Sequence, residues 1–289
     1  MSAVAAVRPP GSVAGHADPL EFVFGGVAFR MHPGPGVRWE LSDEHRRCRA
    51  PFEAGPVAAR VDCVLSPGPE LTTREREIRS EGDGDRTSIA TGGVRASLRR
   101  SGFGHYAATA RVSPDSRGCT SVVTALAGTI QQAGDGLVLH ASGVEIDGGV
   151  ALFVGPSGAG KTTVANHCPS TRAFARDRAA VYRRPDGWYA AVMAGGDPIE
   201  LPPSPHQILP LRGVLRVRRG DVRAQIRALD PLAALVNLRE SLQSSAGDPD
   251  LERRALERIA RLHAEVPVGE LRSVLGGDLT PLIRDWIEH

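Results

Sequence analysis

The chain has 289 residues, a formal net charge of +2, 41% hydrophobic residues and 24% charged residues. These values are ordinary for a globular protein, and the small net charge gives no field that would indicate a nucleic-acid or membrane-surface partner. No run of eighteen apolar residues predicts a membrane span, and the first residues lack a secretory signal pattern. We therefore expect a cytoplasmic protein that binds neither nucleic acid nor membrane.

The first part of the chain predicts a β-rich region without a catalytic motif. Residues 1–18 are rich in alanine, glycine and proline and predict a disordered terminus. Residues 19–118 alternate short apolar segments with Gly, Pro and Asp turns, which is typical of strands. The predicted strands are 21–24, 27–31, 57–65, 94–98 and 106–112, and a hairpin tip is expected at 81–85.

The rest of the chain, residues 119–289, predicts a mixed α/β nucleotide-binding domain. An amphipathic helix is expected over 119–133, because Val122, Val123, Leu126 and Ile130 recur at helical spacing. Strands are then predicted at 136–140, 144–146, 150–154, 179–182, 187–192 and 214–217, with a turn between the first two and another at Asp147. Helices at 231–242, 251–264 and 280–287 form a helical C-terminal tail.

The four cysteines, Cys48, Cys63, Cys119 and Cys168, are far apart and form no Cys-x-x-Cys pair. A chain of this length without a secretory signal is expected to keep such residues as free buried thiols, rather than in disulfides or a zinc site.

One lysine, Lys161, stands among 35 lysine and arginine residues. It lies in Gly155-Pro-Ser-Gly-Ala-Gly-Lys-Thr162, which fits the P-loop pattern Gly-x-x-x-x-Gly-Lys-[Ser/Thr]. Such a lysine contacts the β- and γ-phosphates as a compact ammonium, a role that a planar guanidinium does not fill. A predicted apolar strand precedes the pattern and a helix follows it, as a P-loop requires. The candidate nucleotide-binding residues are Gly155, Pro156, Ser157, Gly158, Ala159, Gly160, Lys161, Thr162 and Thr163.

The segment His140-Ala-Ser-Gly-Val-Glu-Ile-Asp-Gly-Gly-Val-Ala-Leu-Phe-Val-Gly-Pro-Ser-Gly-Ala-Gly-Lys-Thr-Thr resembles the core of the HPr kinase/phosphorylase family and its relatives, including lasso-peptide-type serine kinases. The resemblance is strong over 121–182, moderate in the tail and weak in the N-terminal region. It implies a P-loop fold of the type shared with phosphoenolpyruvate carboxykinase, and transfer of the γ-phosphoryl group of ATP, with Mg²⁺, to a serine of a peptide or small protein. It is also compatible with a homo-oligomer.

The resemblance assigns roles to residues after and before the P-loop. In the family an Asp-Asp pair follows the P-loop helix, and Arg176-Asp177 stands at the matching place. Asp177 is expected to act as base or as metal ligand beside Thr162. Arg176 replaces the first aspartate and either stabilises transition-state charge, as an arginine finger does, or marks a site that binds nucleotide and transfers poorly. His140 matches a histidine near the transferred phosphate; its other interpretation is a core histidine at a strand end.

Two further features remain open from sequence alone. Glu200 is a candidate second metal ligand or a surface glutamate. Arg212, Arg216, Arg218 and Arg219 form a basic cluster that meets an acidic peptide or nucleotide, or is a solvated strand face. Besides the serine kinase, the alternative functions are a nucleotide-binding regulatory or scaffold module and a small-molecule kinase.

Overall fold

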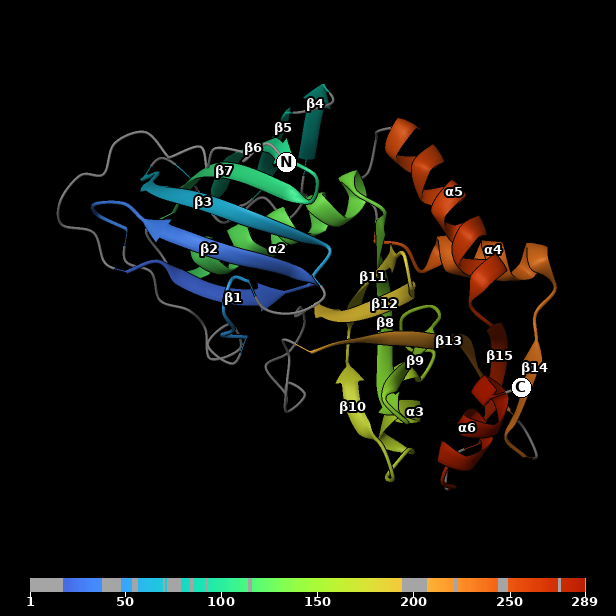
Figure 1. The fold of residues 1–289 in the computed structure, drawn as a ribbon. Coiled ribbons are helices and arrows are strands. Elements are labelled where there is room, and N and C mark those ends of the chain that lie inside the picture. The colour runs from blue at the N-terminus through green and yellow to red at the C-terminus, as the bar shows by residue number, and fades with distance from the viewer. Residues whose placement is uncertain are drawn as a thin grey trace, which may run out of the picture.

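The computed structural model describes residues 18–37, 48–53, 57–69, 71, 79–83, 86–91, 93–113, 116–193, 207–220, 223–243, 249–274 and 277–288. Within these ranges the chain forms a mixed α/β fold with two mixed β-sheets and few helices (Figure 1). The predicted disordered terminus lies almost wholly outside the described residues, and so does Glu200. None of the helices in the described ranges is both long and apolar enough to cross a bilayer.

Residues 20–112 form the first sheet, which confirms the predicted β-rich region. Its seven strands are β1 (Leu20–Phe24), β2 (Val27–Pro33), β3 (Ala59–Pro67), β4 (Arg79–Asp83), β5 (Arg86–Thr91), β6 (Val94–Gly102) and β7 (His105–Val112), in the order β1-β2-β3-β7-β6-β5-β4. Strands β3, β6 and β7 alternate in burial; in β3 the buried side chains are Ala59, Val61, Cys63 and Leu65. Along these strands one face therefore belongs to the core and the other faces solvent. On β1 and β2 a smaller buried cluster of Val23, Ala28 and Phe52 lies on the second face.

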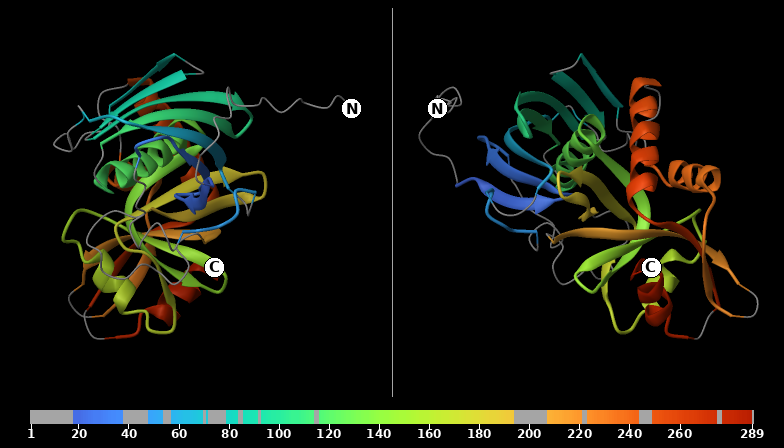
Figure 2. Two further views of the ribbon diagram at one scale, coloured as in Figure 1. Left: turned by 90° about the vertical axis from the view of Figure 1, so that its left-hand side faces the viewer. Right: turned by 45° about the vertical axis from the view of Figure 1, so that its right-hand side comes forward.

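Helix α2 (Ser116–Ala133) lies against the buried face of the first sheet (Figure 2). The predicted apolar stripe is confirmed, because Val122, Val123, Leu126 and Ile130 are all buried. The same helix contacts strands of the second sheet. It is therefore the layer between the two sheets.

The second sheet holds the P-loop strand in its middle. Its strands are β8 (Gly136–Ile146), β9 (Gly149–Val154), β10 (Arg172–Ala175), β11 (Arg178–Arg184), β12 (Gly187–Met193), β13 (Ile208–Arg219), β14 (Gln225–Ala228) and β15 (Val268–Ser273). Two long strands, β8 and β13, each pair with different neighbours along their length, and β9 lies between them. Strands β9, β13 and β15 are parallel, so their carboxyl ends meet at one edge of the sheet.

Besides α2, four described helices cover the two faces of this sheet. Helices α4 (Pro231–Glu240) and α5 (Pro249–Glu265) pack on one face, and α3 (Lys161–Asn166) and α6 (Thr280–Glu288) pack on the other. The Asp230 side chain accepts a hydrogen bond from the Ala233 amide at 3.0 Å and caps the start of α4.

Two sequence expectations about elements are wrong. The turn expected between 140 and 144 is absent, because β8 runs unbroken; Gly143 instead allows close strand contact, since a Cβ there would lie 2.8 Å from the Leu152 side chain. The C-terminal tail is not purely helical, because β15 lies between α5 and α6 and extends the sheet, with β14, which precedes α4, beside it.

The two sheets share one hydrophobic core. A single cluster of buried residues joins Phe29 of β2, Leu126 of α2 and Tyr182 of β11. The β1–β2 turn also docks on the second sheet, where the Gly25 amide donates to the Val192 carbonyl at 3.0 Å. The predicted division at residue 118 thus falls at the start of the helix that both sheets use.

Three of the four cysteines, Cys48, Cys63 and Cys168, are buried and free, as predicted, and the Cys119 side chain lies outside the described part. Burial raises the pKa of Cys63 to about 12 and that of Cys168 to about 11. These thiols are therefore poor nucleophiles near neutral pH.

Candidate functional site

The predicted P-loop connects β9 to α3. Strand β9 ends at Val154, and helix α3 begins at Lys161. Gly158 and Gly160 have φ angles of 77° and 96°, in the left-handed region that favours glycine, although a Cβ at either would meet no atom within 4 Å. Gly158 and Gly160 are therefore needed for backbone conformation rather than for space.

Lys161 lies inside this loop rather than in solvent, with a side chain only 7% exposed. Its Nζ donates to the carbonyl oxygens of Gly155 at 2.9 Å and Pro156 at 3.1 Å. Burial lowers the pKa of Lys161, and the negative charge of Asp177 opposes this effect. The ammonium is thus held at the centre of the loop, and the charge of Asp177 acts on it.

Ser142 joins the P-loop helix to the turn between β10 and β11. This buried side chain donates from Oγ to the Arg176 carbonyl at 2.7 Å, and its Oγ lies 3.3 Å from the Thr162 Oγ1. Thr162 Oγ1 also lies 3.5 Å from the Arg176 carbonyl. The exposed Thr162 hydroxyl is thereby positioned by two separate segments.

Asp177 makes the charged contacts of this site. Its Oδ1 lies 3.2 Å from His140 Nδ1, and its Oδ2 lies 3.2 Å from Arg178 Nε. The backbone fixes this arrangement, because the Ala141 amide donates to the Asp177 carbonyl at 3.0 Å and Arg178 pairs with His140 across β11 and β8. The His140 side chain is 40% exposed, so it is not a core histidine.

The predicted site residues therefore come from three elements that meet at one place. His140 and Ser142 lie two residues apart on β8 and share a face of that strand. Arg176 and Asp177 form the turn that β8 contacts, and Lys161 and Thr162 open α3. Ser142 was not predicted as a site residue; the signal was its spacing of two from His140, which places both side chains on one face.

The donors at this site are of the kind that Mg²⁺ uses together with phosphates. Mg²⁺ is normally held by one or two carboxylates plus phosphate oxygens and water, and Thr162 supplies a hydroxyl and Asp177 a carboxylate. Within the described ranges no three His, Cys, Asp or Glu side chains are grouped to hold a metal ion. The residues present thus fit a metal that arrives with a nucleotide better than an all-protein metal centre.

Comparison with known proteins adds no assignment to this geometry. No protein-family model matches the chain, and no curated protein matches it. What the site does must be inferred from its own residues.

Proposed function

We propose that this protein is an ATP-dependent kinase that transfers the γ-phosphoryl group to a serine hydroxyl of a peptide or small protein, on an HPr-kinase-like P-loop core. One observation carries the proposal: a P-loop lysine and threonine lie in the same cluster as a carboxylate–imidazole pair, joined through Ser142. The P-loop accounts for phosphate binding, and the Asp177–His140 pair accounts for handling of the acceptor proton.

The transfer step follows from these positions. The serine oxygen forms a bond to the γ-phosphorus, the bond from that phosphorus to the β–γ bridging oxygen breaks, and ADP leaves with the bridging oxygen. The serine proton passes to the Asp177 carboxylate, which His140 and Arg178 orient through contacts of 3.2 Å each. Lys161 stays with the β- and γ-phosphate oxygens as their charge changes.

Mg²⁺ is the metal that this reaction class requires, and when bound it neutralises charge on the β- and γ-phosphates. Thr162 is the residue proposed to hold it, because its hydroxyl is exposed at the start of α3. Asp177 is the second candidate ligand, although both its oxygens already contact side chains of the protein.

Arg176 supports a competing function, a nucleotide-binding module with little transfer. It stands where the resembled family has the first aspartate of its Asp-Asp pair, so the site has one carboxylate rather than two. Phosphoryl transfer depends more on positioning and electrostatics than on proton abstraction, and one carboxylate is therefore enough for the kinase.

The test is phosphoryl transfer from γ-labelled ATP with Mg²⁺ to a library of serine peptides, combined with ATP binding by calorimetry. We expect Asp177→Asn to reduce transfer by about 10²- to 10⁴-fold while ATP·Mg²⁺ affinity is retained. Asp186→Asn is the matched control, because Asp186 follows the other end of β11 and lies outside the cluster. This control should transfer like the parent protein.

Other outcomes separate the alternatives. Tight ATP binding without transfer to any peptide would favour the nucleotide-binding module, and transfer to small hydroxylated compounds but not peptides would favour a small-molecule kinase. A loss of Mg²⁺ affinity in Asp177→Asn would indicate that Asp177 is a metal ligand rather than the base.

A further inference from the structure

Strands β13, β14 and β15 carry a group of arginines around one buried carboxylate. We call Arg216, Arg218, Arg227 and Arg272 the arginine cluster. Glu270 is 2% exposed, and its Oε1 accepts from Arg227 Nη2 at 2.9 Å and from Arg272 Nε at 3.0 Å. Its Oε2 lies 3.1 Å from Arg218 Nε.

Strand register places these side chains on one face in two rows. Arg216 pairs with Glu270, which pairs with Arg227, and in the next row Arg218 pairs with Arg272. Neighbouring strands lie about 4.8 Å apart, so the cluster spans roughly 10 Å across three strands. It is therefore an extended surface rather than a small enclosed pocket.

The charges of the cluster are far from balanced. The cluster has four guanidinium groups and one carboxylate, so its net charge is +3. Among the described residues, Glu270 is the only carboxylate within ion-pair distance of Arg218, Arg227 and Arg272. Burial alone would raise the pKa of Glu270, but the hydrogen bond from Arg272 and the charges of Arg227 and Arg218 hold it below its usual value.

Glu270 also orients the guanidinium groups. Arg218 and Arg272 contact it through Nε, so their terminal nitrogens are left for another anion. The Arg218, Arg227 and Arg272 side chains remain 49%, 58% and 39% exposed. The Nε of Arg216 is buried and has no hydrogen-bond partner within the described part of the chain. Arginines fixed in this way lose little entropy when they bind carboxylates in bidentate geometry.

The cluster borders the P-loop. Arg216 pairs with Val154, the last residue of β9 before the loop, and a Cβ on Gly155 would lie 3.5 Å from the Val217 carbonyl. Ligands of sheets with parallel strands bind beyond the carboxyl ends of those strands, where both the P-loop and the cluster lie. His140 and Asp177 lie on the other side of β9 in the strand order.

We propose that the arginine cluster is the docking site for an acidic segment of the acceptor polypeptide, which brings a serine beside that segment to the P-loop phosphates. This proposal rests on the kinase function proposed above. An open surface spanning three strands suits several carboxylates along an extended segment, as in recognition of acidic motifs by arginine clusters. A single phosphate would need an enclosed set of donors instead.

The test measures binding of fluorescent twelve-residue peptides by anisotropy in the absence of nucleotide. One peptide carries a serine followed by six aspartates and glutamates, and the other carries asparagine and glutamine at those six positions. We expect the acidic peptide to bind at least about tenfold more tightly, and the preference to weaken as salt is raised. The double variant Arg218→Gln/Arg272→Gln should lose that preference, whereas Arg239→Gln on α4 should keep it.

A single variant keeps the test valid if the double variant does not fold. Arg218→Gln alone leaves Arg227 and Arg272 on Glu270 and should still reduce acidic-peptide affinity severalfold. Equal binding of the two peptides, or tighter binding of a single-stranded oligonucleotide or inorganic phosphate than of the acidic peptide, would overturn the docking site. Preferential binding of the acidic peptide without any phosphoryl transfer would support the docking site and contradict the kinase function. Equal phosphoryl transfer to both peptides, unchanged in the arginine variants, would support the kinase function and contradict the docking site.

Discussion

At the scale of single residues, Lys161 is the position where the site tolerates least change. This residue is only 7% exposed, and its ammonium donates to the Gly155 and Pro156 carbonyls at 2.9 and 3.1 Å. A guanidinium is larger and planar and presents its donors in another geometry. Charge alone therefore does not define the residue that this loop needs.

We expect Lys161→Arg to lose ATP binding almost as fully as Lys161→Met. With ATP·Mg²⁺ at about 100 times its dissociation constant, the parent protein should gain roughly 2.7 kcal/mol of stability, seen as a rise in melting temperature. Both variants should show almost no rise. A Lys161→Arg variant that ATP stabilises as strongly as the parent protein would contradict the phosphate-binding role of this side chain.

The sequence predicted some residues of the site better than others, for a physical reason. The P-loop is a local pattern in which backbone conformation and lysine chemistry are set within eight residues, so Gly158, Gly160 and Lys161 could be identified directly. Ser142 acts between distant segments, because its partners are Thr162 and the Arg176 carbonyl. Its spacing of two from His140 places it on the same face of β8, but nothing in the local sequence indicates its partners.

At the scale of elements, β15, one of the strands that the sequence did not predict, shows how a buried charge obscures the apolar periodicity of a strand. Strand β15 alternates Val268, Glu270 and Arg272 on one face, and this polar pattern does not predict a central strand. Glu270 is buried only because arginines from β13 and β14 neutralise it. The strand therefore becomes recognisable only when its neighbours are known.

Helix α5 is attached to the end of α2 by one buried arginine. Arg258, 9% exposed, donates from Nη1 to the carbonyls of Gln132 at 2.7 Å and Gly136 at 3.2 Å. Burial lowers the pKa of its guanidinium. The carbonyls at a helix end lack partners within the helix, so Arg258 supplies them and links three elements.

Replacement of this arginine should therefore destabilise the fold. We expect Arg258→Met to lower the free energy of unfolding by about 2 kcal/mol, because charged hydrogen bonds to buried carbonyls are lost. The exposed neighbour Arg254→Met, one helical turn earlier, should change it by less than about 0.5 kcal/mol. Urea titration measures the free energy of unfolding of both variants. Equal values for Arg258→Met and Arg254→Met would contradict the structural role of Arg258.

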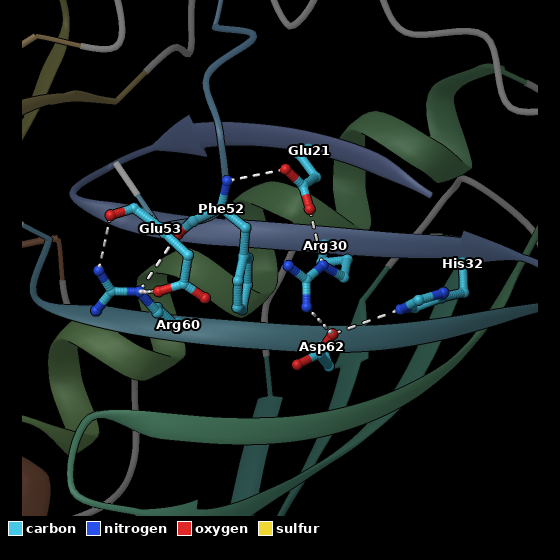
Figure 3. Close-up of polar contacts among 7 residues, drawn as sticks. All are labelled: Glu21, Arg30, His32, Phe52, Glu53, Arg60 and Asp62. Carbon is cyan, nitrogen blue, oxygen red and sulfur yellow. Dashed lines mark hydrogen bonds and ion pairs between the residues drawn. The ribbon is translucent and has the colours of Figure 1, made fainter. Parts of the chain in front are cut away.

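The exposed face of the first sheet carries a chain of polar contacts across β1, β2 and β3 (Figure 3). Glu21 Oε1 accepts from Arg30 Nε at 2.8 Å, and its Oε2 accepts from the Phe52 amide at 3.0 Å. Arg30 also lies over the Phe52 ring, with Cζ 4.1 Å from the ring centroid. The backbone hydrogen bond from Phe52 and the hydrogen bond from Arg30 lower the pKa of Glu21 below its usual 4.5.

A carboxyl pKa that is lower in the folded state makes ionised Glu21 stabilising, fully so above its unfolded-state pKa and not at all below its folded-state pKa. Its contribution should be complete well above pH 4.5 and disappear as the pH falls through the folded-state pKa. Glu21→Gln should thus cost about 1 kcal/mol at neutral pH and almost nothing near pH 2. Glu53→Gln is the control, since Glu53 is 75% exposed; a Glu21→Gln deficit that does not depend on pH would contradict the ionic origin.

At the scale of the whole molecule, α2 ties the two sheets together. Its apolar side chains lie in one cluster with side chains of β2 and β11. Both sheets therefore need the helix to complete this part of their core. The sequence indicated the helix from its periodicity, but not that both of its sides pack on sheets. Which surfaces a helix covers depends on residues far away in the chain.

A shared core predicts that both sheets unfold together. Phe29→Ala in β2 should lower the free energy of unfolding by about 3–5 kcal/mol. In a Trp39→Phe variant, the tryptophan fluorescence comes from Trp188 in β12 and Trp286 in α6, so it monitors unfolding of the second sheet and its helices. Trp188 is only 4% exposed. We expect Phe29→Ala to shift the fluorescence transition and the circular-dichroism transition by the same amount. If the fluorescence transition stays in place while part of the circular-dichroism signal moves to lower urea, the first sheet unfolds on its own and residues 19–118 form an independent unit.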